Sequence, residues 1–140
     1  MASLLSGRPP DNLGAKNGRL AACKRSPNCV SSQADRADAE HYIAPIAFKG
    51  TTAEAMAAAR RAIEAMERAR IVREEPGGAA NYLYSEFSSK LLGFVDDFEL
   101  LYDEKAGVFH VRSASRLGRR DFGVNRARVE KLRALIAGPR

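Results

Sequence analysis

Apolar residues recur at helical spacing in two segments of the chain. The first segment, residues 51–70, opens with Thr51 and has Glu54 three residues later, a capping-box signature for a helix start. Its apolar stripe comprises Met56, Ala59, Ile63 and Met66. The stripe of the second segment comprises Val129, Leu132 and Ile136. We predict that the second helix begins near Asn125, a good N-cap residue, ends at Gly138, and packs in the core like the first.

A second pattern, rich in β-branched and aromatic residues, predicts strands. The predicted strands are residues 41–48, 69–75, 81–89, 94–102 and 108–115. Pro45 confines the first of them to an edge or a bulge of the sheet. Residues 103–107 form a hairpin connection in which Gly107 is available for a positive φ angle.

The element order is therefore β-α-β-β-β-β-α, and consecutive strands with short connections indicate an antiparallel meander. We predict an α+β fold, with an antiparallel sheet of about five strands and two helices packed on one face. Residues 1–40 show no sustained periodicity and are punctuated by proline and glycine, so we expect an irregular N-terminal arm. Residues 41–140 then form a single α+β domain, along which the arm either packs or extends into solvent.

Strand parity gives a hypothesis for the register of the last hairpin. If Tyr102 faces Val108, Asp96 faces Ala114 and shares a sheet face with Arg112 and Arg116, while Asp97, Glu99, Ser113 and Ser115 share the other face. A bulge in the hairpin would shift one strand and exchange the faces.

Positive charge is concentrated at the C-terminal end. The net charge of the whole chain is +6, and residues 106–140 contain nine basic and two acidic residues. Such a segment can attract nucleic acid, anionic lipid or a small acidic molecule, or it can be a solvated surface. Phe122 is the one aromatic residue between Arg116 and Arg140, so we expect a small anion or an acidic partner rather than nucleic acid.

The same segment supplies a candidate anion site. Arginine presents planar, paired donors suited to carboxylate or phosphate. Gly118 and Gly123 let the backbone approach a ligand, and the start of the last helix favours negative charge. The candidate ligand-binding residues are Arg112, Arg116, Arg126, Asp96, Ser113, Ser115 and Asn125. The alternative is that the arginines pair internally with Asp96, Asp97, Glu99 and Asp121.

No catalytic residue is identified with comparable support. The chain contains no P-loop, dinucleotide fingerprint or zinc-protease motif, so we predict no cofactor. An enzyme using Cys29, with His41 as its base, or using the Asp96 region is the alternative to a non-enzymatic binding module. Weak nucleic-acid binding through the basic C-terminal third is a further alternative, tested by its salt dependence.

Cys23 and Cys29 are the only cysteines, and a disulfide between them would close a short loop. The N-terminus shows no secretory signal and no segment is long and apolar enough to span a membrane. We therefore expect two reduced thiols and a soluble cytoplasmic protein, with a periplasmic or lumenal location as the alternative if the start is misplaced. With His41 and His110, the cysteines match no standard zinc spacing, so no metal site is predicted.

Several sequence blocks carry a family resemblance. They are GRPPDNLG (7–14), PNCVSS (27–32), His41 with Pro45, YLYSEFSSKLLGFVDDFE (82–99), VRSASRLG (111–118) and DFGVNRARVEKLR (121–133). With these blocks the chain resembles, over nearly its whole length, the uncharacterised family called domain of unknown function 1499. The resemblance implies a family found in bacteria and plastid-bearing eukaryotes, some of whose members carry export signals or lipoprotein anchors, and it implies no activity. The chain departs from the family at Arg119, where relatives often have an aromatic residue.

Overall fold

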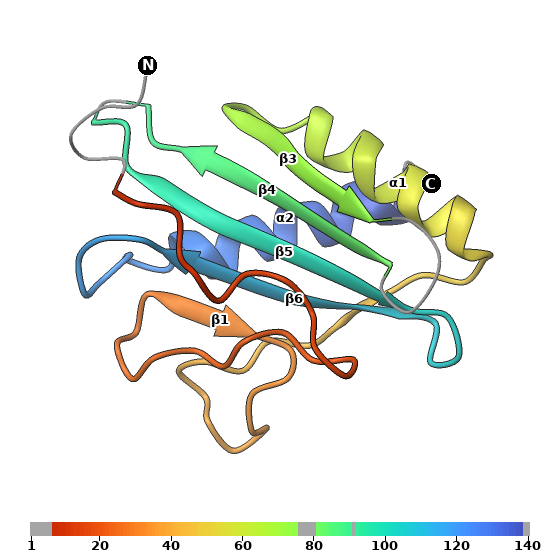
Figure 1. The fold of residues 1–140 in the computed structure, drawn as a ribbon, viewed down its shortest axis with the longest axis horizontal. Coiled ribbons are helices and arrows are strands. Elements are labelled where there is room, and N and C mark those ends of the chain that lie inside the picture. Colours follow the sequence, from red (N-terminus) through yellow and green to blue (C-terminus); the bar gives the residue numbers. More distant parts are fainter. Residues whose placement is uncertain (1–6, 76–80, 91, 139–140) are drawn as a thin grey trace.

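The computed structural model describes residues 7–75, 81–90 and 92–138, and it confirms the α+β class, with two helices and a six-stranded antiparallel sheet (Figure 1). The elements in chain order are β1 (Cys29–Ser31), β2 (Ile46–Ala47), α1 (Thr52–Glu64), β3 (Ala69–Glu75), β4 (Tyr82–Ser88), β5 (Val95–Asp103), β6 (Val108–Ser115) and α2 (Val124–Ala137).

The sheet order is β1-β6-β5-β4-β3, and β2 also pairs with β6. The meander from β3 to β6 places consecutive strands side by side, as predicted. The outer edge of β6 is shared, because β1 pairs with residues 112–114 and β2 with residues 108–109. Within the predicted strand 41–48, the strand is thus limited to the two residues of β2 directly after Pro45, and Tyr42 forms an isolated bridge with Ser31.

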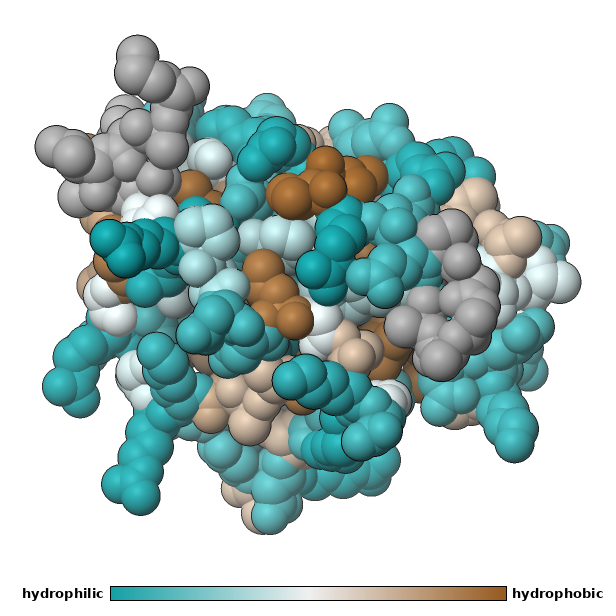
Figure 2. Space-filling view, in the orientation of Figure 1, coloured by the Kyte–Doolittle hydropathy of each residue, from teal (hydrophilic) through white to brown (hydrophobic). Residues whose placement is uncertain are grey.

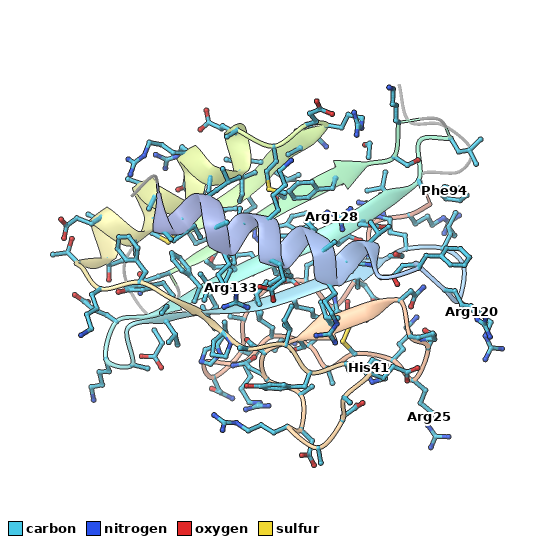
Figure 3. All side chains as sticks on the ribbon, turned by 180° about the vertical axis from the view of Figure 1, so that it is seen from behind. Arg25, His41, Phe94, Arg120, Arg128 and Arg133 are labelled. Carbon is cyan, nitrogen blue, oxygen red and sulfur yellow. A yellow bond between two sulfur atoms is a disulfide. The ribbon has the colours of Figure 1, made fainter. Side chains whose placement is uncertain are left out.

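Both helices cover one face of the sheet, which we call the helix face (Figures 1 and 3). The predicted stripes are confirmed, since Met56 and Ile63 of α1 and Val129 and Leu132 of α2 are buried in one core cluster. The sheet contributes alternate residues to this cluster, including Leu83, Phe98, Leu100, Phe109 and Val111. The cluster therefore fixes which side chains of each strand point away from the helices.

The opposite face is covered by the N-terminal segment, and we call it the arm face. Residues 7–22, here called the arm, cross in front of the sheet (Figure 1). Leu13, Ala15 and Leu20 of the arm pack with Tyr82, Tyr84 and Leu101 in a second apolar cluster. Residues 7–22, which are part of the N-terminal segment 1–40 considered above, therefore pack on this face of the sheet.

Two element boundaries and one strand differ from prediction. The capping box is present, with Thr51 accepting from the Glu54 amide at 3.1 Å, but α1 ends at Glu64 because β3 begins at Ala69. The N-cap of α2 is Gly123 rather than Asn125, whose side chain is buried against β6 instead. Strand β1 was not predicted, since three residues are too few to show a period, and pairing with β6 rather than propensity extends them.

Candidate functional site

Acidic and basic side chains of the two longest strands meet on the arm face. Glu99 of β5 pairs with Arg112 of β6, and Asp97 pairs with Ala114. Side chains alternate between the faces of a strand, so Asp97, Glu99 and Arg112 all project toward the arm. Arg116, which follows the end of β6, turns to the same side and contacts Asp97 at 2.9 Å.

The predicted register of this hairpin was wrong by one residue. Tyr102 pairs with Phe109 rather than with Val108, and Asp96 pairs with Ser115 rather than with Ala114. The cause is the loop, because β5 continues to Asp103 and leaves residues 104–107 as the connection, with Gly107 at a φ of 65°. A shift of one residue exchanges the two faces of a strand.

The shift separates the predicted site residues into two groups. Asp96 lies on the helix face, where its carboxylate is 2.9 Å from the guanidinium of Arg128. Ser113 donates a hydrogen bond to the Asn125 side-chain oxygen at 2.6 Å, and the Asn125 amide donates to Ser115 at 2.9 Å. These four predicted residues therefore join β5 and β6 to α2. Of the four, only Ser115 also lines the cavity that Arg112 and Arg116 line.

Arg126 is separate from both groups. Its guanidinium donates to the carbonyls of Ala39 and Glu40, each at 3.3 Å, and it lines a surface hollow with Phe122 and Arg120. The predicted cluster of three arginines is therefore reduced to Arg112 and Arg116.

Arg116 is saturated by the protein itself. Its Nε donates to both carboxylate oxygens of Asp97, at 3.0 and 3.2 Å, and its Nη2 donates to Glu86 at 2.6 Å. The Tyr84 hydroxyl donates to Asp97 and accepts from Arg116 at 3.2 Å. Although partial burial disfavours the charged forms, these contacts raise the pKa of Arg116, and hydrogen bonds from Arg70 and Arg116 lower the pKa of Glu86. Internal pairing, the alternative raised by the sequence, holds for this arginine.

Glu99 is engaged by partners other than arginine. The Tyr82 hydroxyl donates to its Oε2, and the Gly14 amide of the arm donates to the same oxygen at 2.8 Å. Glu99 is fully buried, and burial raises its pKa in spite of these two hydrogen bonds. Burial and the nearby Glu99 charge together raise the pKa of Tyr82. Oε1 of Glu99 accepts no hydrogen bond from the part of the chain that the structure describes.

Arg112 projects from the same face of the sheet as Arg116, but its contacts with acidic groups are weaker. Its Nη1 lies 3.6 Å from Oε1 of Glu99, which is beyond a good hydrogen bond. Its residue is only 5% exposed, and its Nε has no hydrogen-bond acceptor among residues 7–75, 81–90 and 92–138. A buried guanidinium with an unused donor is costly to keep in a folded protein.

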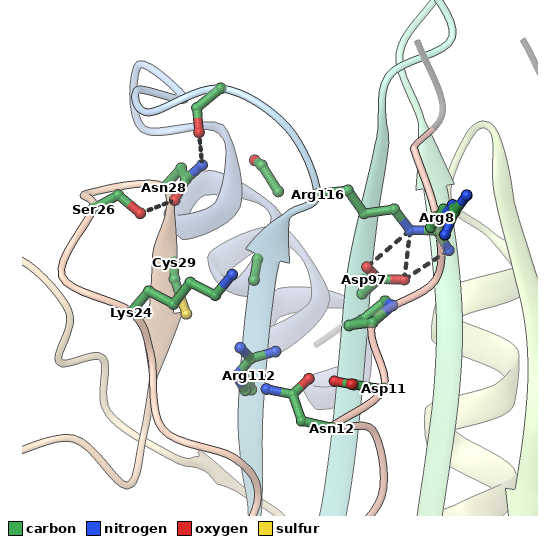
Figure 4. Close-up of a pocket in the computed structure, with 14 residues that line it drawn as sticks. Arg8, Asp11, Asn12, Lys24, Ser26, Asn28, Cys29, Asp97, Arg112 and Arg116 are labelled. Atoms are coloured by element: carbon green, nitrogen blue, oxygen red, sulfur yellow. Dashed lines mark hydrogen bonds and ion pairs between the residues drawn. The ribbon is translucent and has the colours of Figure 1, made fainter. Parts of the chain in front are cut away.

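Arg112 faces a cavity of about 280 Å³ between the arm and the loop that precedes β1 (Figure 4). We call it the arm cavity. Its walls include Arg8, Asp11 and Asn12 of the arm and Lys24 and Ser26 of the loop, and its floor includes Asp97, Arg112 and Arg116. Figure 4 shows the side chains of Asn12, Lys24 and Arg112 directed toward the same space. Arg8 and Lys24 are exposed and form no ion pair with any described residue, so positive charge dominates the opening.

The loop of this cavity is closed by a disulfide between Cys23 and Cys29. The expectation of two reduced thiols was wrong, because strand β1 holds Cys29 beside the turn that returns Cys23 to it. Residues 23–29, here called the disulfide loop, are also held by His41, whose Nε2 lies 2.9 Å from the Ser26 carbonyl. Cys29 carries no thiol in this structure, which removes the basis for a cysteine nucleophile.

The arm residues of the site carry no signal in the sequence. Arg8 and Asn12 of the arm, like Lys24 of the disulfide loop, lie in a segment without periodicity, and only the tertiary fold brings them near Arg112. A partial signal existed for Asp97 and Glu99, which parity placed on one face and which the corrected register joins to the arginines. Within the described residues, no group of three or more potential metal ligands is present, and no helix is long and apolar enough to cross a membrane.

A family model described as protein of unknown function (DUF1499) matches residues 19–136. The match includes the disulfide loop and both strands of the floor, whereas Arg8 and Asn12 precede it. No curated protein and no solved structure matches the chain.

Proposed function

The chain belongs to the DUF1499 family of proteins of unknown function, and since membership assigns no activity, we propose from the geometry that it is a non-enzymatic binding module for a small anion. The anion binds in the arm cavity, with Arg112 beneath it and with Lys24 and Arg8 at the opening. The binding residues of the proposal are therefore Arg112 from the predicted set, together with groups from the arm and the disulfide loop.

The proposal depends on Arg112, whose guanidinium has fewer hydrogen-bond acceptors within the described part of the protein than that of Arg116. Two arginine side chains stand on the same face, each with little exposure. Arg116 has acceptors for its donors, whereas Arg112, which lines the arm cavity, has no acceptor among the described residues for its buried Nε–H. An anion supplies the missing acceptor and the opposite charge together. A carboxylate or phosphate can accept two parallel hydrogen bonds from the planar guanidinium.

The size and charge of the arm cavity limit the ligand class. A volume of about 280 Å³ is just below the range of small-molecule pockets, which run from about 300 to 1,000 Å³. It fits inorganic phosphate, a short phosphate ester or a small polycarboxylate, or the acidic side chain of a partner. Asp11 and Asp97 also line the cavity, so the anion binds where Lys24 and Arg112 converge rather than beside these acids.

A thermal-shift panel of inorganic phosphate, citrate, acetate and an acidic peptide tests the proposal. We expect at least one of the polyvalent anions to raise the melting temperature, because a ligand that binds only the folded state stabilises it. Lys24→Ala should weaken calorimetric affinity about tenfold, as expected for one charge-assisted hydrogen bond. Lys49→Ala is the matched control, since Lys49 is exposed and lies outside the arm cavity. The absence of a shift with every anion, or equal affinities for the two lysine variants, would end the proposal.

We also propose that the protein works in an oxidising compartment, and its disulfide supports this. Disulfides persist in periplasmic, lumenal and extracellular spaces and are rare in the cytosol. Alkylation before and after reduction, followed by mass spectrometry of the protein taken from its native cells, checks this. Alkylation of Cys23 and Cys29 without prior reduction would contradict it.

A further inference from the structure

Most of the large apolar side chains that are exposed in the described residues lie at one end of the sheet. At this end β4 finishes, β5 begins and β6 finishes, and we call it the loop end. The exposed large apolar residues there are Leu92, Phe94, Leu117, Phe122 and Val124. Among the described residues, only Val72 and Leu135 of this class lie elsewhere. Phe122 is 92% exposed, which is extreme for a phenylalanine.

Two loops bring these residues to the same end. Ser88 pairs with Val95 across the first loop, and the Arg116 amide donates to the Val95 carbonyl at 3.2 Å where the second loop begins. The second loop, residues 116–123, leads directly into α2. In Figure 3, Phe94 and Arg120 project from the same end of the molecule.

The backbone around Phe122 is held in place. The Asp121 carboxylate accepts from the Gly123 amide at 2.9 Å and from the Asn125 amide at 3.1 Å. Asn28 donates to the Gly118 carbonyl at 2.7 Å, which ties the loop to the disulfide loop. Phe122 has a φ of 54°, a conformation that side chains other than glycine rarely adopt. The fold therefore fixes this ring in an outward position at some conformational cost.

Positive charge surrounds the apolar residues. Arg25, Arg119 and Arg120 are exposed and form no ion pair with any described residue. Lys90 is exposed on the neighbouring loop. Figure 3 shows Arg25 and Arg120 extending away from the body, and Figure 2 shows long hydrophilic side chains protruding at this end.

We propose that the loop end binds the surface of an anionic lipid bilayer, with Phe122 inserted between the headgroups and Arg119, Arg120 and Arg25 on lipid phosphates. Apolar side chains flanked by arginine match the two zones of a membrane surface, namely the apolar acyl region and the anionic headgroups. A ring that protrudes almost completely enters a fluid interface, whereas a protein partner would need a deep complementary pocket. Facing copies of the loop end would repel each other through their arginines.

The chain contains no tryptophan, so a single introduced one reports insertion directly. Phe122→Trp should show a blue-shifted emission and quenching by lipid-phase quenchers on vesicles of equal parts phosphatidylcholine and phosphatidylglycerol. Pure phosphatidylcholine should produce a much smaller change. Val72→Trp is the matched control, because Val72 is 42% exposed on β3, and its emission should not change. Unchanged emission of Phe122→Trp would overturn the proposal.

Vesicle co-sedimentation of variants separates the contribution of Phe122 to lipid binding from that of the arginines. Phe122→Ser should lower the partition coefficient about tenfold through lost apolar burial. Arg119→Ala with Arg120→Ala should lower it about fivefold for each residue and reduce its salt dependence. The control pair Arg36→Ala with Arg61→Ala makes the same charge change at exposed sites outside the loop end and should act like wild type.

Further variants distinguish the lipid surface from a second copy of the chain and from the arm cavity. Equal partitioning of Phe122→Ser and wild type onto vesicles would contradict the proposal. Self-association through Phe122 in the absence of lipid would also contradict it, because the partner would then be a second copy of the chain. Arg112→Gln should retain vesicle binding, and free inorganic phosphate at moderate concentration should not displace the protein. Loss of binding in either test would assign the lipid contact to the arm cavity instead. Vesicle binding and the anion-binding proposal can therefore fail independently.

Discussion

At the residue scale, two arginines of similar type and burial have different roles. Arg116 has converging acceptors from Asp97 and Glu86, whereas the acid beside Arg112 directs one oxygen to Tyr82 and to the arm. The distinction depends on where a few hydroxyl and amide donors lie, rather than on the number of charges. Arg116 therefore stabilises the fold, and Arg112 is the arginine that we propose binds the anion.

Arg116→Met should be strongly destabilising. Removing the guanidinium leaves Asp97 buried at 2% exposure without a cation, and breaking a buried pair from one side costs about 3–5 kcal/mol. Urea denaturation measures the loss in the free energy of unfolding. Arg73→Met serves as the control, because its pair with Glu75 is half exposed and should contribute under about 1 kcal/mol. Similar losses in the two variants would contradict the assigned role of Arg116.

His41 should make stability depend on pH near neutrality. Its Nδ1 lies 2.7 Å from Asp38 and its Nε2 lies 2.9 Å from the Ser26 carbonyl, so both ring nitrogens act as donors in the charged form. Burial opposes the charge, but these two partners raise the pKa of His41 above 6.5. A raised histidine pKa gives stability that is complete below about pH 6.5 and is lost as pH rises through the folded-state value.

Urea denaturation of wild type and His41→Gln across this range checks the sign. The free energy of unfolding of wild type should fall with rising pH above about 6.5, and that of His41→Gln should fall less. Asp38→Asn should show the same reduced slope, because it removes the main acidic partner of the ring. A wild-type stability that rises over this interval would refute the assignment.

At the element scale, short connections decide what the site contains. A hairpin loop of residues 104–107, instead of 103–107, moves Asp97 and Glu99 onto the face of Arg112. The disulfide loop carries Lys24 and Ser26 to the opposite wall of the arm cavity. Correctly predicted strands and helices therefore do not show which residues meet in the site, because this depends on the loops that connect them.

Removing the disulfide should lower both the stability of the fold and the affinity of the arm cavity for an anion. The double variant Cys23→Ser with Cys29→Ser should lose about 2 kcal/mol on the chain-entropy model for a loop of residues 23–29. Its affinity for an anion should fall as well, because Lys24 is no longer held near Arg112. Calorimetric titration at a temperature where the variant remains folded provides the measurement. Unchanged affinity in a folded variant would show that the disulfide loop does not position the ligand.

The helices and the meander could be predicted because their signals are local. The stripe Met56, Ala59, Ile63 and the capping box at Thr51 specify α1 from a few neighbouring residues. The register could not be predicted, since a loop one residue shorter satisfies the same apolar pattern and reverses the faces. The arm cavity was beyond sequence reasoning because Asn12 and Arg112 are a hundred positions apart and no period relates them.

At the scale of the whole molecule, the sheet separates two kinds of chemistry. The helix face is an apolar core, and polar groups of the sheet on this face are paired with α2: Asp96 with Arg128, and Ser113 with Asn125. The arm face has a polar layer of buried carboxylates, tyrosines and arginines beneath a thin covering segment. Beneath this thin segment lies the arm cavity, and for this reason we propose that the ligand binds on the arm face.

The most direct test of the central claim follows the arginine Nε–H signals by nuclear magnetic resonance during titration with inorganic phosphate and then with citrate. We expect the Arg112 Nε–H resonance to shift saturably with one of the two anions. The Arg116 Nε–H resonance should remain in place, because it already donates to Asp97. An Arg112 signal that does not respond to either anion, or an Arg116 signal that shifts as much as that of Arg112, would contradict the account.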